Sequence, residues 1–241
     1  MNKKIFFLLV NICLMVTLSN AQITYERGYA ILKDGTRING LISRFDQDPW
    51  FNQRYILFKD SAEFASNPES KATKYKADDL QFYQLGNTSY DKIHFVDTEN
   101  LQLKSLGTND HMMERLSTGR INAHKFYSYP IDVEVFIGTA QELAEWISKN
   151  KSESLSGYKI LITKDKDGKP KNAFNIDMLK YFEDTPEVSQ KFKTGAYGNE
   201  PVGEKKGLAA KMISMAKKAT FKPREAEAIV TAINDYNQRN P

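Results

Sequence analysis

Residues 28–45, GYAILKDGTRINGLISRF, decide the fold of the first half of the chain. Apolar and polar side chains alternate on both sides of Asp34-Gly35, and alternation with a period of two is the pattern of β-strands. An Asp-Gly pair between two such runs is the strongest local signal for a β-hairpin, and it favours a type I′ turn, in which both central residues have positive φ. The sequence therefore predicts an antiparallel hairpin over residues 28–45.

Further short apolar runs follow this hairpin. A loop rich in Ser, Asn and Pro is predicted over residues 61–70, and Gly86-Asn87 predicts a turn. The predicted strands between these breaks are residues 55–58, 73–76, 80–85 and 93–96. Together with the hairpin they indicate an antiparallel β-meander or a small barrel over residues 22–97.

The hairpin resembles the first motif of Sm-like small barrels. Residues 30–46 contain a Leu-x-x-Gly turn, a second Gly, a bent strand and Asp46. The resemblance implies a barrel in which Asp46 and Asn52 lie near an RNA-binding loop, but the second motif of the family, an Arg-Gly or Lys-Gly dipeptide before the last strands, is missing. Any curled hairpin would use the same glycines, because glycine relieves crowding at a strand bend. A small barrel and an open meander therefore both remain as alternatives for residues 22–97. RNA binding is not expected.

The middle of the chain mixes strand and helix patterns. Residues 110–116, beginning with a capping Asp, predict a short helix, and residues 121–129 predict a strand. Apolar side chains alternate over residues 131–137, as in a further strand. Thr139 begins a Thr-x-x-Glu capping box, which predicts a helix over residues 140–150.

A second hairpin is predicted from residues 158–163 and 171–176. The Asp-Lys-Asp-Gly run at its turn, residues 165–168, invites comparison with the calcium loop of an EF-hand. The first and twelfth positions of such a loop would be Thr163 and Phe174, which supply no carboxylate to the ion. We therefore expect a turn without a metal.

The last part of the chain is predicted to be helical. Asp177 and Thr185-Pro186 are helix-start signals, and Gly195 is a stop signal. Apolar stripes recur at helical spacing over residues 208–219 and 226–236. The expected fold class is α+β. Its expected parts are a β-rich domain at residues 22–97, a mixed α/β segment packed on it at residues 98–176, and a helical region at residues 177–241.

Residues 1–21 have the pattern of a secretory signal peptide. Lys3 and Lys4 form a basic start, and the apolar stretch over residues 5–16 is too short for a stable membrane span. Ser19-Asn20-Ala21 is a small-x-small cleavage site. We therefore expect export, with cleavage before Gln22.

Cleavage would change the composition in a useful way. The chain of 241 residues would shorten to 220, and its formal charge would fall from +4 to +2 because two lysines are lost. Its single cysteine, Cys13, would be lost too, and this excludes structural disulfides, thiolate metal sites and a cysteine nucleophile. Lipid attachment at Cys13 is not expected, because Ile12 rather than a small residue precedes it. We expect the periplasm or the outer-membrane or extracellular side of a Gram-negative bacterium.

Several short segments together resemble a family of exported bacterial envelope proteins of unknown function. The matching segments are residues 28–40, 75–82, 116–127, 174–182 and 229–237. The resemblance implies an envelope location and implies no reaction.

No catalytic or metal-binding arrangement is recognisable in the sequence. His94, His111 and His124 lie too far apart for a short metal-binding spacing. The pairs Asp78-Asp79 and Glu183-Asp184 lie at predicted element ends, where acidic residues cap helices or stay in solvent. Hydrolase elbows, phosphate loops and dinucleotide fingerprints do not occur. We therefore assign no catalytic, cofactor-binding or metal-binding residues.

The most strongly basic stretch is residues 205–222. Its apolar stripe, with lysines around it, favours an amphipathic helix. Such a helix either lies on anionic lipid headgroups or packs its stripe on the domain and leaves its lysines in solvent. The residues of this candidate membrane or partner surface are Lys205, Lys206, Lys211, Met212, Lys217 and Lys218. A nucleic-acid partner is not expected, because the whole chain is nearly neutral.

These observations favour an exported, non-catalytic binding or interaction module whose partner is an envelope protein or a surface ligand. Two alternatives stay open. One is a peripheral membrane protein that uses residues 205–222, and the other is an uncharacterised hydrolase. No cofactor is expected.

The signal peptide gives a direct prediction. When the full chain is expressed in a Gram-negative host, the mature protein should begin at Gln22, as N-terminal sequencing of the periplasmic or secreted fraction would show. A protein that keeps Met1 and stays in the cytoplasm would contradict export.

Overall fold

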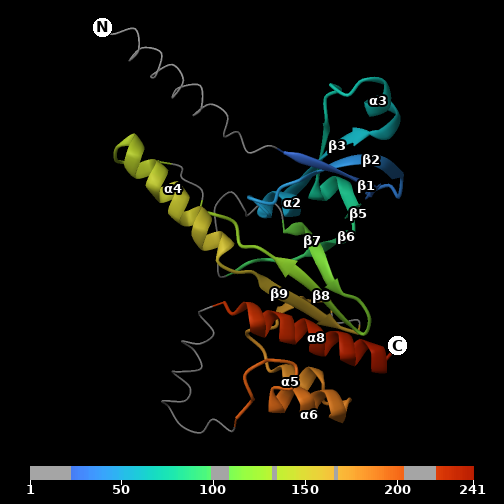
Figure 1. The fold of residues 1–241 in the computed structure, drawn as a ribbon, viewed down its shortest axis with the longest axis vertical. Helices are drawn as coiled ribbons and strands as arrows, with labels where there is room; N and C mark the ends of the chain where they lie inside the picture. The colour runs from blue at the N-terminus through green and yellow to red at the C-terminus, as the bar shows by residue number, and fades with distance from the viewer. Residues whose placement is uncertain (1–22, 99–108, 132–134, 166–167, 204–220) are drawn as a thin grey trace, which may run out of the picture.

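The computed structural model describes residues 23–98, 109–131, 135–165, 168–203 and 221–241. Within them, one antiparallel sheet of ten strands has the order β10-β9-β8-β7-β6-β5-β1-β2-β3-β4. The strands are β1 (Thr24–Leu32), β2 (Arg37–Arg44), β3 (Tyr55–Asp60), β4 (Thr73–Lys76), β5 (Leu80–Leu85), β6 (Thr88–His94), β7 (Asp110–Ser117), β8 (Ile121–Phe126), β9 (Lys159–Lys164) and β10 (Lys171–Asn172). The sheet is open, with β4 and β10 as its edges, so the small barrel is not supported, whereas the α+β class is confirmed (Figure 1).

The first hairpin forms as predicted, but its turn is of a different type. Gly35 has a φ of 88°, while Lys33 and Asp34 keep negative φ. The Gly35 N–H donates to the carbonyl of Leu32 at 2.9 Å, and the Leu32 N–H donates to the carbonyl of Thr36 at 2.8 Å. The turn is therefore closed by a left-handed glycine after two ordinary turn residues, and type I′ was the wrong expectation.

Gly28 and Gly40 are needed for close approach of neighbouring strands. They face each other in the register of β1 and β2. A Cβ atom at Gly28 would lie 2.0 Å from the carbonyl oxygen of Gln84, and one at Gly40 would lie 2.1 Å from that of Lys59. The two glycines thus let β5 and β3 pair closely with the hairpin.

The strands predicted over residues 55–58, 73–76 and 80–85 are present as β3, β4 and β5. The strand predicted over residues 93–96 is displaced: β6 spans Thr88–His94 and excludes residues 95 and 96, because pairing with β5 begins directly after the turn, with Thr88 opposite Leu85. The predicted loop over residues 61–70 contains a short helix, α3 (Ser61–Ser66), because the carboxylate of Asp60 caps the backbone N–H groups of Ala62 and Glu63 at 2.8 and 3.1 Å. The sheet then continues from β6 into β7, across the expected boundary between residues 97 and 98.

The expected helix over residues 110–116 is wrong, because this segment is strand β7. It pairs with β6 on one side and with β8 on the other. Met112 and Met113 are both completely buried, although successive side chains of a strand point to opposite faces. Both faces are therefore covered at β7, and the resulting run of apolar residues lacks the alternation that marks a half-exposed strand.

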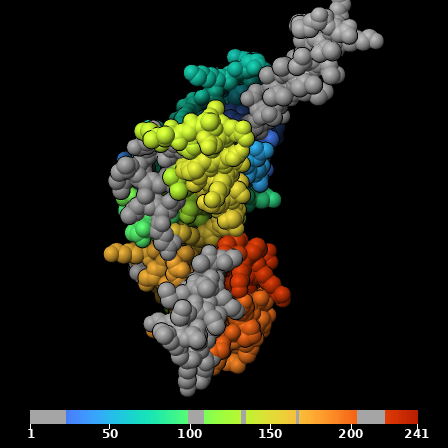
Figure 2. Space-filling view, turned by 90° about the vertical axis from the view of Figure 1, so that its left-hand side faces the viewer, coloured from blue at the N-terminus to red at the C-terminus, as the bar shows by residue number. Residues whose placement is uncertain are grey.

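The capping box at Thr139 is confirmed as the start of helix α4 (Ala140–Leu155), in which the Glu142 carboxylate accepts from the Thr139 N–H at 2.7 Å. Only Asn150 of this helix is buried, and α4 stands out from the sheet as a ridge (Figures 1 and 2). The strand expected over residues 131–137 is not formed at residue 131 or residues 135–137, and Ile137 is 97% exposed. Residues 132–134 lie outside the described residues.

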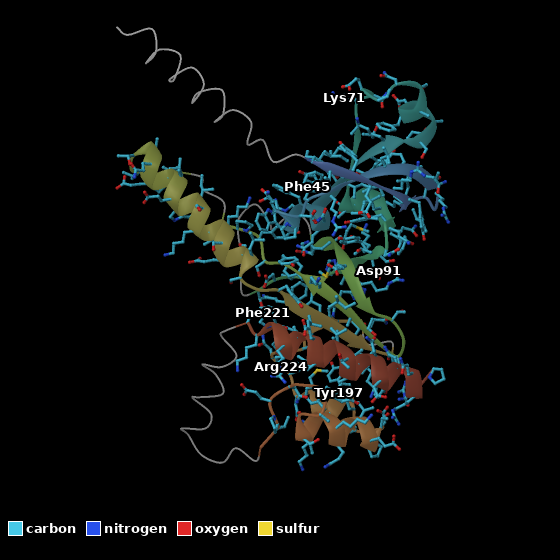
Figure 3. All side chains as sticks on the ribbon, in the orientation of Figure 1. Phe45, Lys71, Asp91, Tyr197, Phe221 and Arg224 are labelled. Atoms are coloured by element: carbon cyan, nitrogen blue, oxygen red, sulfur yellow. The ribbon has the colours of Figure 1, made fainter. Side chains whose placement is uncertain are left out.

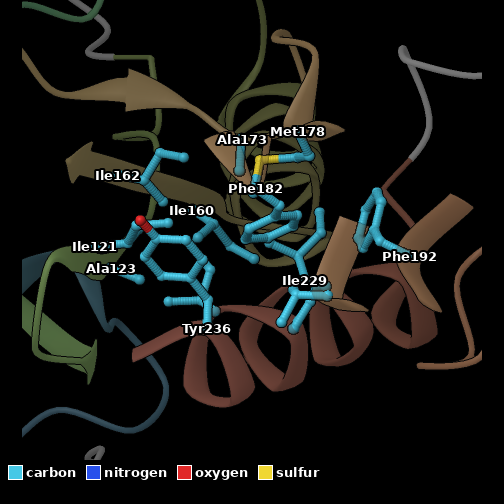
Figure 4. Packing of buried hydrophobic residues seen from close by; sticks show 14 residues of the cluster. Ile121, Ala123, Ile160, Ile162, Ala173, Met178, Phe182, Phe192, Ile229 and Tyr236 are labelled. Atoms are coloured by element: carbon cyan, nitrogen blue, oxygen red, sulfur yellow. The ribbon is translucent and has the colours of Figure 1, made fainter. Parts of the chain in front are cut away.

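The described part of the C-terminal region is helical, as predicted, and its helices form a layer that packs on strands β7, β8 and β9. It contains α5 (Met178–Tyr181), α6 (Pro186–Thr194) and α8 (Pro223–Arg239). As predicted, Asp177 caps α5 and a left-handed Gly195 ends α6. The buried residues between the helices and the sheet form the C-terminal core (Figure 4). They are Ile121, Ala123, Ile160, Ile162, Ala173, Met178, Phe182, Val188, Phe192, Ala226, Ile229, Ala232, Ile233 and Tyr236.

Asn237 joins α8 to the hairpin of β7 and β8. Its side-chain oxygen accepts from the Ile121 N–H at 2.9 Å, and its amide nitrogen donates to the Ile121 carbonyl at 2.8 Å and to the Ser117 hydroxyl at 3.0 Å. Gly119 makes room for this contact, since a Cβ atom there would lie 2.5 Å from the side-chain carbonyl carbon of Asn237. The helix is thus fastened to the sheet by polar as well as apolar contacts.

Replacing this side chain should loosen the C-terminal layer. Asn237→Ala leaves two backbone groups of Ile121 without a partner, so the free energy of unfolding should fall by roughly 2 kcal/mol in urea denaturation. Gln238→Ala, at an exposed neighbouring position of α8, is the matched control and should unfold like the wild-type chain. Equal stability of both variants would contradict the role given to Asn237.

Candidate functional site

The six residues that the sequence singles out as a membrane or partner surface lie outside the described residues. They are Lys205, Lys206, Lys211, Met212, Lys217 and Lys218. Peripheral membrane association through them stays a prediction. Among the described residues, no helix has the length and apolar character needed to cross a membrane.

The three histidines have separate partners. His94 Nδ1 lies 2.7 Å from the Asp110 carboxylate, and His124 Nε2 lies 2.9 Å from the Asp91 carboxylate. His111 is buried against Tyr129, as described below. In the part of the chain that the structure describes, no group of three or more His, Cys, Asp or Glu side chains is arranged to hold a metal ion.

Asp91 is the centre of a polar cluster with Arg115 and His124. Arg115 donates to both of its carboxylate oxygens, and His124 donates to one of them. Burial raises the pKa of the Asp91 carboxyl, but the hydrogen bonds from His124 and Arg115 outweigh burial and hold the pKa at about 2. The three residues come from β6, β7 and β8, and they join these strands side to side without lining either cavity described below (Figure 3).

The two carboxylate pairs of the sequence do not meet each other. Asp79 accepts from the Lys76 N–H at 2.9 Å at the short helix η1 (Ala77–Asp79). Asp184 pairs with Lys164 at 3.0 Å and accepts from the Tyr236 hydroxyl at 2.8 Å. Both therefore have structural partners.

The two residues that the Sm-like resemblance places near an RNA-binding loop also have structural partners. The buried Asn52 amide binds the N–H and the carbonyl of Phe45, each at 3.2 Å. Asp46 forms an ion pair with Arg44 at 2.7 Å. These contacts, in an open sheet, do not support the barrel role that the resemblance implies.

Two cavities stand out in the described chain. The larger, of about 640 Å³, lies between the β9–β10 hairpin and the start of α8. Its apolar walls are shared with the C-terminal core, and its lysines, Lys159 and Lys222, form ion pairs with Asp97 and Glu200, each at 2.5 Å. The smaller, of about 460 Å³, gathers basic groups that are not neutralised in this way. We therefore take the smaller one as the candidate site and call it the basic cavity.

The basic cavity is built by segments that lie far apart in the sequence. They are helix α2 (Trp50–Arg54), the start of β3, strand β4, η1, the start of β7 and the segment after β8. The lining residues are Phe51, Arg54, Tyr55, Lys74, Lys76, Ala77, Asp78, Asp110, His111 and Tyr129. Three of them are basic, and three are aromatic rings.

A buried glutamine positions one wall of the cavity. Gln53, next to Arg54 in α2, donates from its amide nitrogen to the Tyr127 carbonyl at 2.9 Å and accepts from the Tyr127 N–H at 2.6 Å. This pair of bonds fastens α2 to the chain just after β8. As a result the side chain of Arg54 reaches the ring of Tyr129, with the guanidinium carbon 4.0 Å from the ring centroid.

Two of the three basic side chains of the cavity, those of Arg54 and Lys74, lie over aromatic rings rather than beside carboxylates. The ammonium of Lys74 lies 3.8 Å from the ring centroid of Tyr55, an arrangement that parallels Arg54 on Tyr129. Within the described residues, no ion pair involves Arg54, Lys74 or Lys76. The cavity thus offers three cationic groups whose charge is not cancelled by a bonded carboxylate.

The acidic residues of the cavity only partly offset this charge. The Asp110 carboxylate is shared between Lys92 at 3.3 Å and His94 at 2.7 Å, neither of which lines the cavity. Asp78 is exposed at the cavity rim and forms no ion pair within the described residues. With Asp110 neutralised by its own partners, three cations face one carboxylate.

The floor of the cavity is a buried, neutral histidine. His111 is 6% exposed, and burial lowers its pKa to about 4, with the nearby Arg54 charge acting in the same direction. Its Nε2 lies 3.2 Å from the Phe95 carbonyl, which can only accept, so Nε2 carries the proton and Nδ1 accepts from the Tyr129 hydroxyl at 2.8 Å. Burial also raises the pKa of Tyr129 to about 12, so this pair carries no charge at neutral pH.

Comparisons of the chain with protein-family models, with curated proteins and with solved structures found no match.

Sequence reasoning missed the basic residues of this site. The alternation within β4 does place Lys74 and Lys76 on one face of that strand, and this much is visible in the sequence. Their meeting with Arg54 depends on the register of β4 with β3, in which Lys76 faces Tyr55. No local pattern specifies that register.

The buried histidine predicts a pH dependence of stability. The unfolded chain should bind a proton at His111 near pH 6.5, whereas the folded chain binds it only near pH 4, so acidification favours unfolding between these values. Between pH 7 and pH 5 the free energy of unfolding should fall by about 2 kcal/mol through this residue. Urea denaturation at the two pH values would measure it.

The variant His111→Gln should lose much less free energy of unfolding between pH 7 and pH 5 than the wild type does. The variant His94→Gln, changed at an exposed position, should lose as much as the wild type. A variant His111→Gln that loses as much stability as the wild type between pH 7 and pH 5 would contradict the assignment. Carboxylates with lowered pKa, such as Asp91 and Asp110, act at lower pH and do not confuse the comparison.

Proposed function

We propose that this protein is a non-catalytic binding module that holds a small anionic ligand in the basic cavity. The observation that carries the proposal is the convergence of Arg54, Lys74 and Lys76 on one cavity, with no carboxylate of the described chain bonded to them. Anions are the groups that such cations bind, and a guanidinium can hold a carboxylate or phosphate through two parallel hydrogen bonds.

The aromatic residues indicate that the ligand also carries a ring or another apolar part. Phe51, Tyr55 and Tyr129 contribute rings to the cavity, and Phe51 and Tyr55 are only half-buried, so part of their surface is open to a ligand. A volume of about 460 Å³ lies within the range of cavities that take small organic molecules. A ligand that consists of a ring with one anionic group fits both the basic and the aromatic residues of the cavity.

The state of His111 supports binding rather than catalysis. Both ring nitrogens are engaged in hydrogen bonds to Tyr129 and Phe95, and the low pKa leaves the ring without a proton to donate as an imidazolium near neutral pH. His111 therefore has a structural role, in which its Nδ1 atom holds the hydroxyl of Tyr129 in place in the cavity wall.

We further propose that the module acts outside the cytoplasm, in the envelope of a Gram-negative bacterium. The support for this part is the signal-peptide pattern of residues 1–21. Acidic envelope molecules of small size would then be its ligands.

Calorimetric titration tests the binding function. Benzoate and phenyl phosphate, which combine a ring with an anion, should bind, and uncharged benzyl alcohol should bind much more weakly. Arg54→Gln and Lys74→Gln should each weaken anion binding about tenfold, because each removes a charge-assisted contact.

Lys71→Gln is the matched control. Lys71 is exposed, lies outside the basic cavity and sits near the end of the molecule that carries β3 and α3 (Figure 3). This variant should bind both anions like the wild type. Unchanged affinity in Arg54→Gln and Lys74→Gln, with their folding verified by circular dichroism, would refute the proposal.

A further inference from the structure

The charge of the basic cavity is larger than a single carboxylate requires. Arg54, Lys74 and Lys76 contribute three positive charges, and Asp78 contributes one negative charge. Asp110 adds no net charge, because Lys92 and His94 are bonded to its carboxylate from outside the cavity. The groups that face a ligand therefore carry a net formal charge of about +2 at neutral pH.

The three cations also differ in how they can contact an anion. Arg54 is half-buried and lies over Tyr129, so its guanidinium is held in place at the back of the site. There it can donate two parallel hydrogen bonds to an anion. Lys74 and Lys76 lie on the same side of the edge strand β4 and are exposed, so their ammonium groups act as point charges at the mouth of the cavity. A tetrahedral group with several oxygens can contact a guanidinium and two point charges together, which a planar carboxylate with two oxygens does less well.

We infer that the ligand of the basic cavity is a phosphate monoester, a doubly charged phosphoryl group attached to a ring that lies against the aromatic residues. This inference rests on the proposed function and names its ligand class. The net charge of +2 in the cavity equals the charge of the dianion in magnitude and has the opposite sign. The guanidinium of Arg54 and the ammonium groups of the two lysines provide hydrogen-bond donors for the phosphoryl oxygens. The rings of Phe51 and Tyr55 supply the surface for the organic part.

The lining groups whose pKa is shifted by burial or hydrogen bonding keep their charge between pH 7.5 and pH 5. The second pKa of a phosphate ester lies near 6, so the ligand passes from dianion to monoanion between pH 7.5 and pH 5. His111 on β7 has its pKa lowered to about 4 by burial, and hydrogen bonding from His94 lowers the pKa of the Asp110 carboxyl. Burial raises the pKa of Tyr55 on β3 and of Tyr129 after β8. The remaining charged groups that face the ligand are Arg54 on α2, Lys74 and Lys76 on β4, and Asp78 on η1.

The experiment compares three probes that share a ring and differ in charge. Phenyl phosphate, phenyl sulfate and benzoate are titrated into the full-length mature protein by calorimetry at pH 7.5 and pH 5.0. Phenyl phosphate should bind at least tenfold more tightly than phenyl sulfate at pH 7.5, because it carries one more negative charge into a cavity of net positive charge. At pH 5.0, where both esters are monoanions, the two affinities should agree within about twofold.

A charge variant sharpens the comparison. Lys76→Gln lowers the cavity charge by one and should cut the preference for phenyl phosphate over phenyl sulfate at pH 7.5 to about threefold, whereas Lys71→Gln, outside the cavity, should leave it unchanged. Circular dichroism and the urea midpoint show whether each variant is folded.

The outcomes separate the two proposals. Equal affinity for phenyl phosphate, phenyl sulfate and benzoate at pH 7.5 would overturn the phosphate inference and leave anion binding intact. Binding of none of the three probes would overturn both. A preference for phenyl phosphate that persists at pH 5.0, or that Lys76→Gln leaves untouched, would show that charge matching in the basic cavity is not its cause and would overturn the inference.

Discussion

Strand β7 is the element on which the rest of the structure depends, because it is hydrogen-bonded on both sides and contacts all three parts of the core. Met112 belongs to the core of the first half, with Ile42, Leu80 and Tyr83. Met113 belongs to a middle cluster with Trp50 and Phe126, and Leu116 packs against the C-terminal core. Side chains from one strand thus reach each cluster in turn, and the ten strands form one sheet rather than two.

The same strand joins the fold to the candidate site. His111, one residue before Met112, is buried by the middle cluster and turns its ring toward Tyr129. Because the ring is almost completely buried, protonation would place a charge where little water reaches it, and the neutral form is favoured. The cavity floor is therefore rigid and uncharged, and the charge of the site is confined to its walls.

Those walls are positioned by hydrogen bonds of buried amides as well as by apolar packing. Asn52 and Gln53, adjacent in α2, bind the backbone at Phe45 and Tyr127 in opposite directions. Each amide satisfies one N–H and one carbonyl that a strand end would otherwise leave without partners. A helix of five residues is not stable alone, so these bonds fix both its place and the direction of Arg54.

Features that depend on neighbours in the sequence were the ones that sequence reasoning predicted well. The hairpin around Gly35, the capping box at Thr139 and the apolar stripe of α8 are confirmed because each follows from local geometry. β7 was predicted as a helix because both of its faces are covered, and α3 was missed because its cap, Asp60, lies at the end of a strand. The open sheet was not separable from a barrel, since curvature depends on how distant strands pair.

The basic cavity could not be predicted for a related reason. Its cations come from α2 and β4, and its floor comes from β7 and the segment after β8, so no short stretch of sequence contains the pattern. Single charged residues such as Arg54 resemble any solvated surface residue until their partners are known. What distinguishes them in space is that no carboxylate of the described residues is bonded to them, and this property exists only in the folded chain.

The absence of described carboxylates bonded to Arg54, Lys74 and Lys76 has an energetic consequence that links stability to binding. Three like charges around one cavity repel each other, and among the described lining residues Asp78 is the one carboxylate that offsets the repulsion without a bonded cation of its own. The aromatic rings under Arg54 and Lys74 stabilise the cations by cation–π contacts but cannot neutralise them. A bound anion of the proposed kind would reduce this repulsion, and the reduction would add to its affinity. Two of the three charges, those of Lys74 and Lys76, lie on β4, an edge strand, where lysines also discourage pairing with other chains.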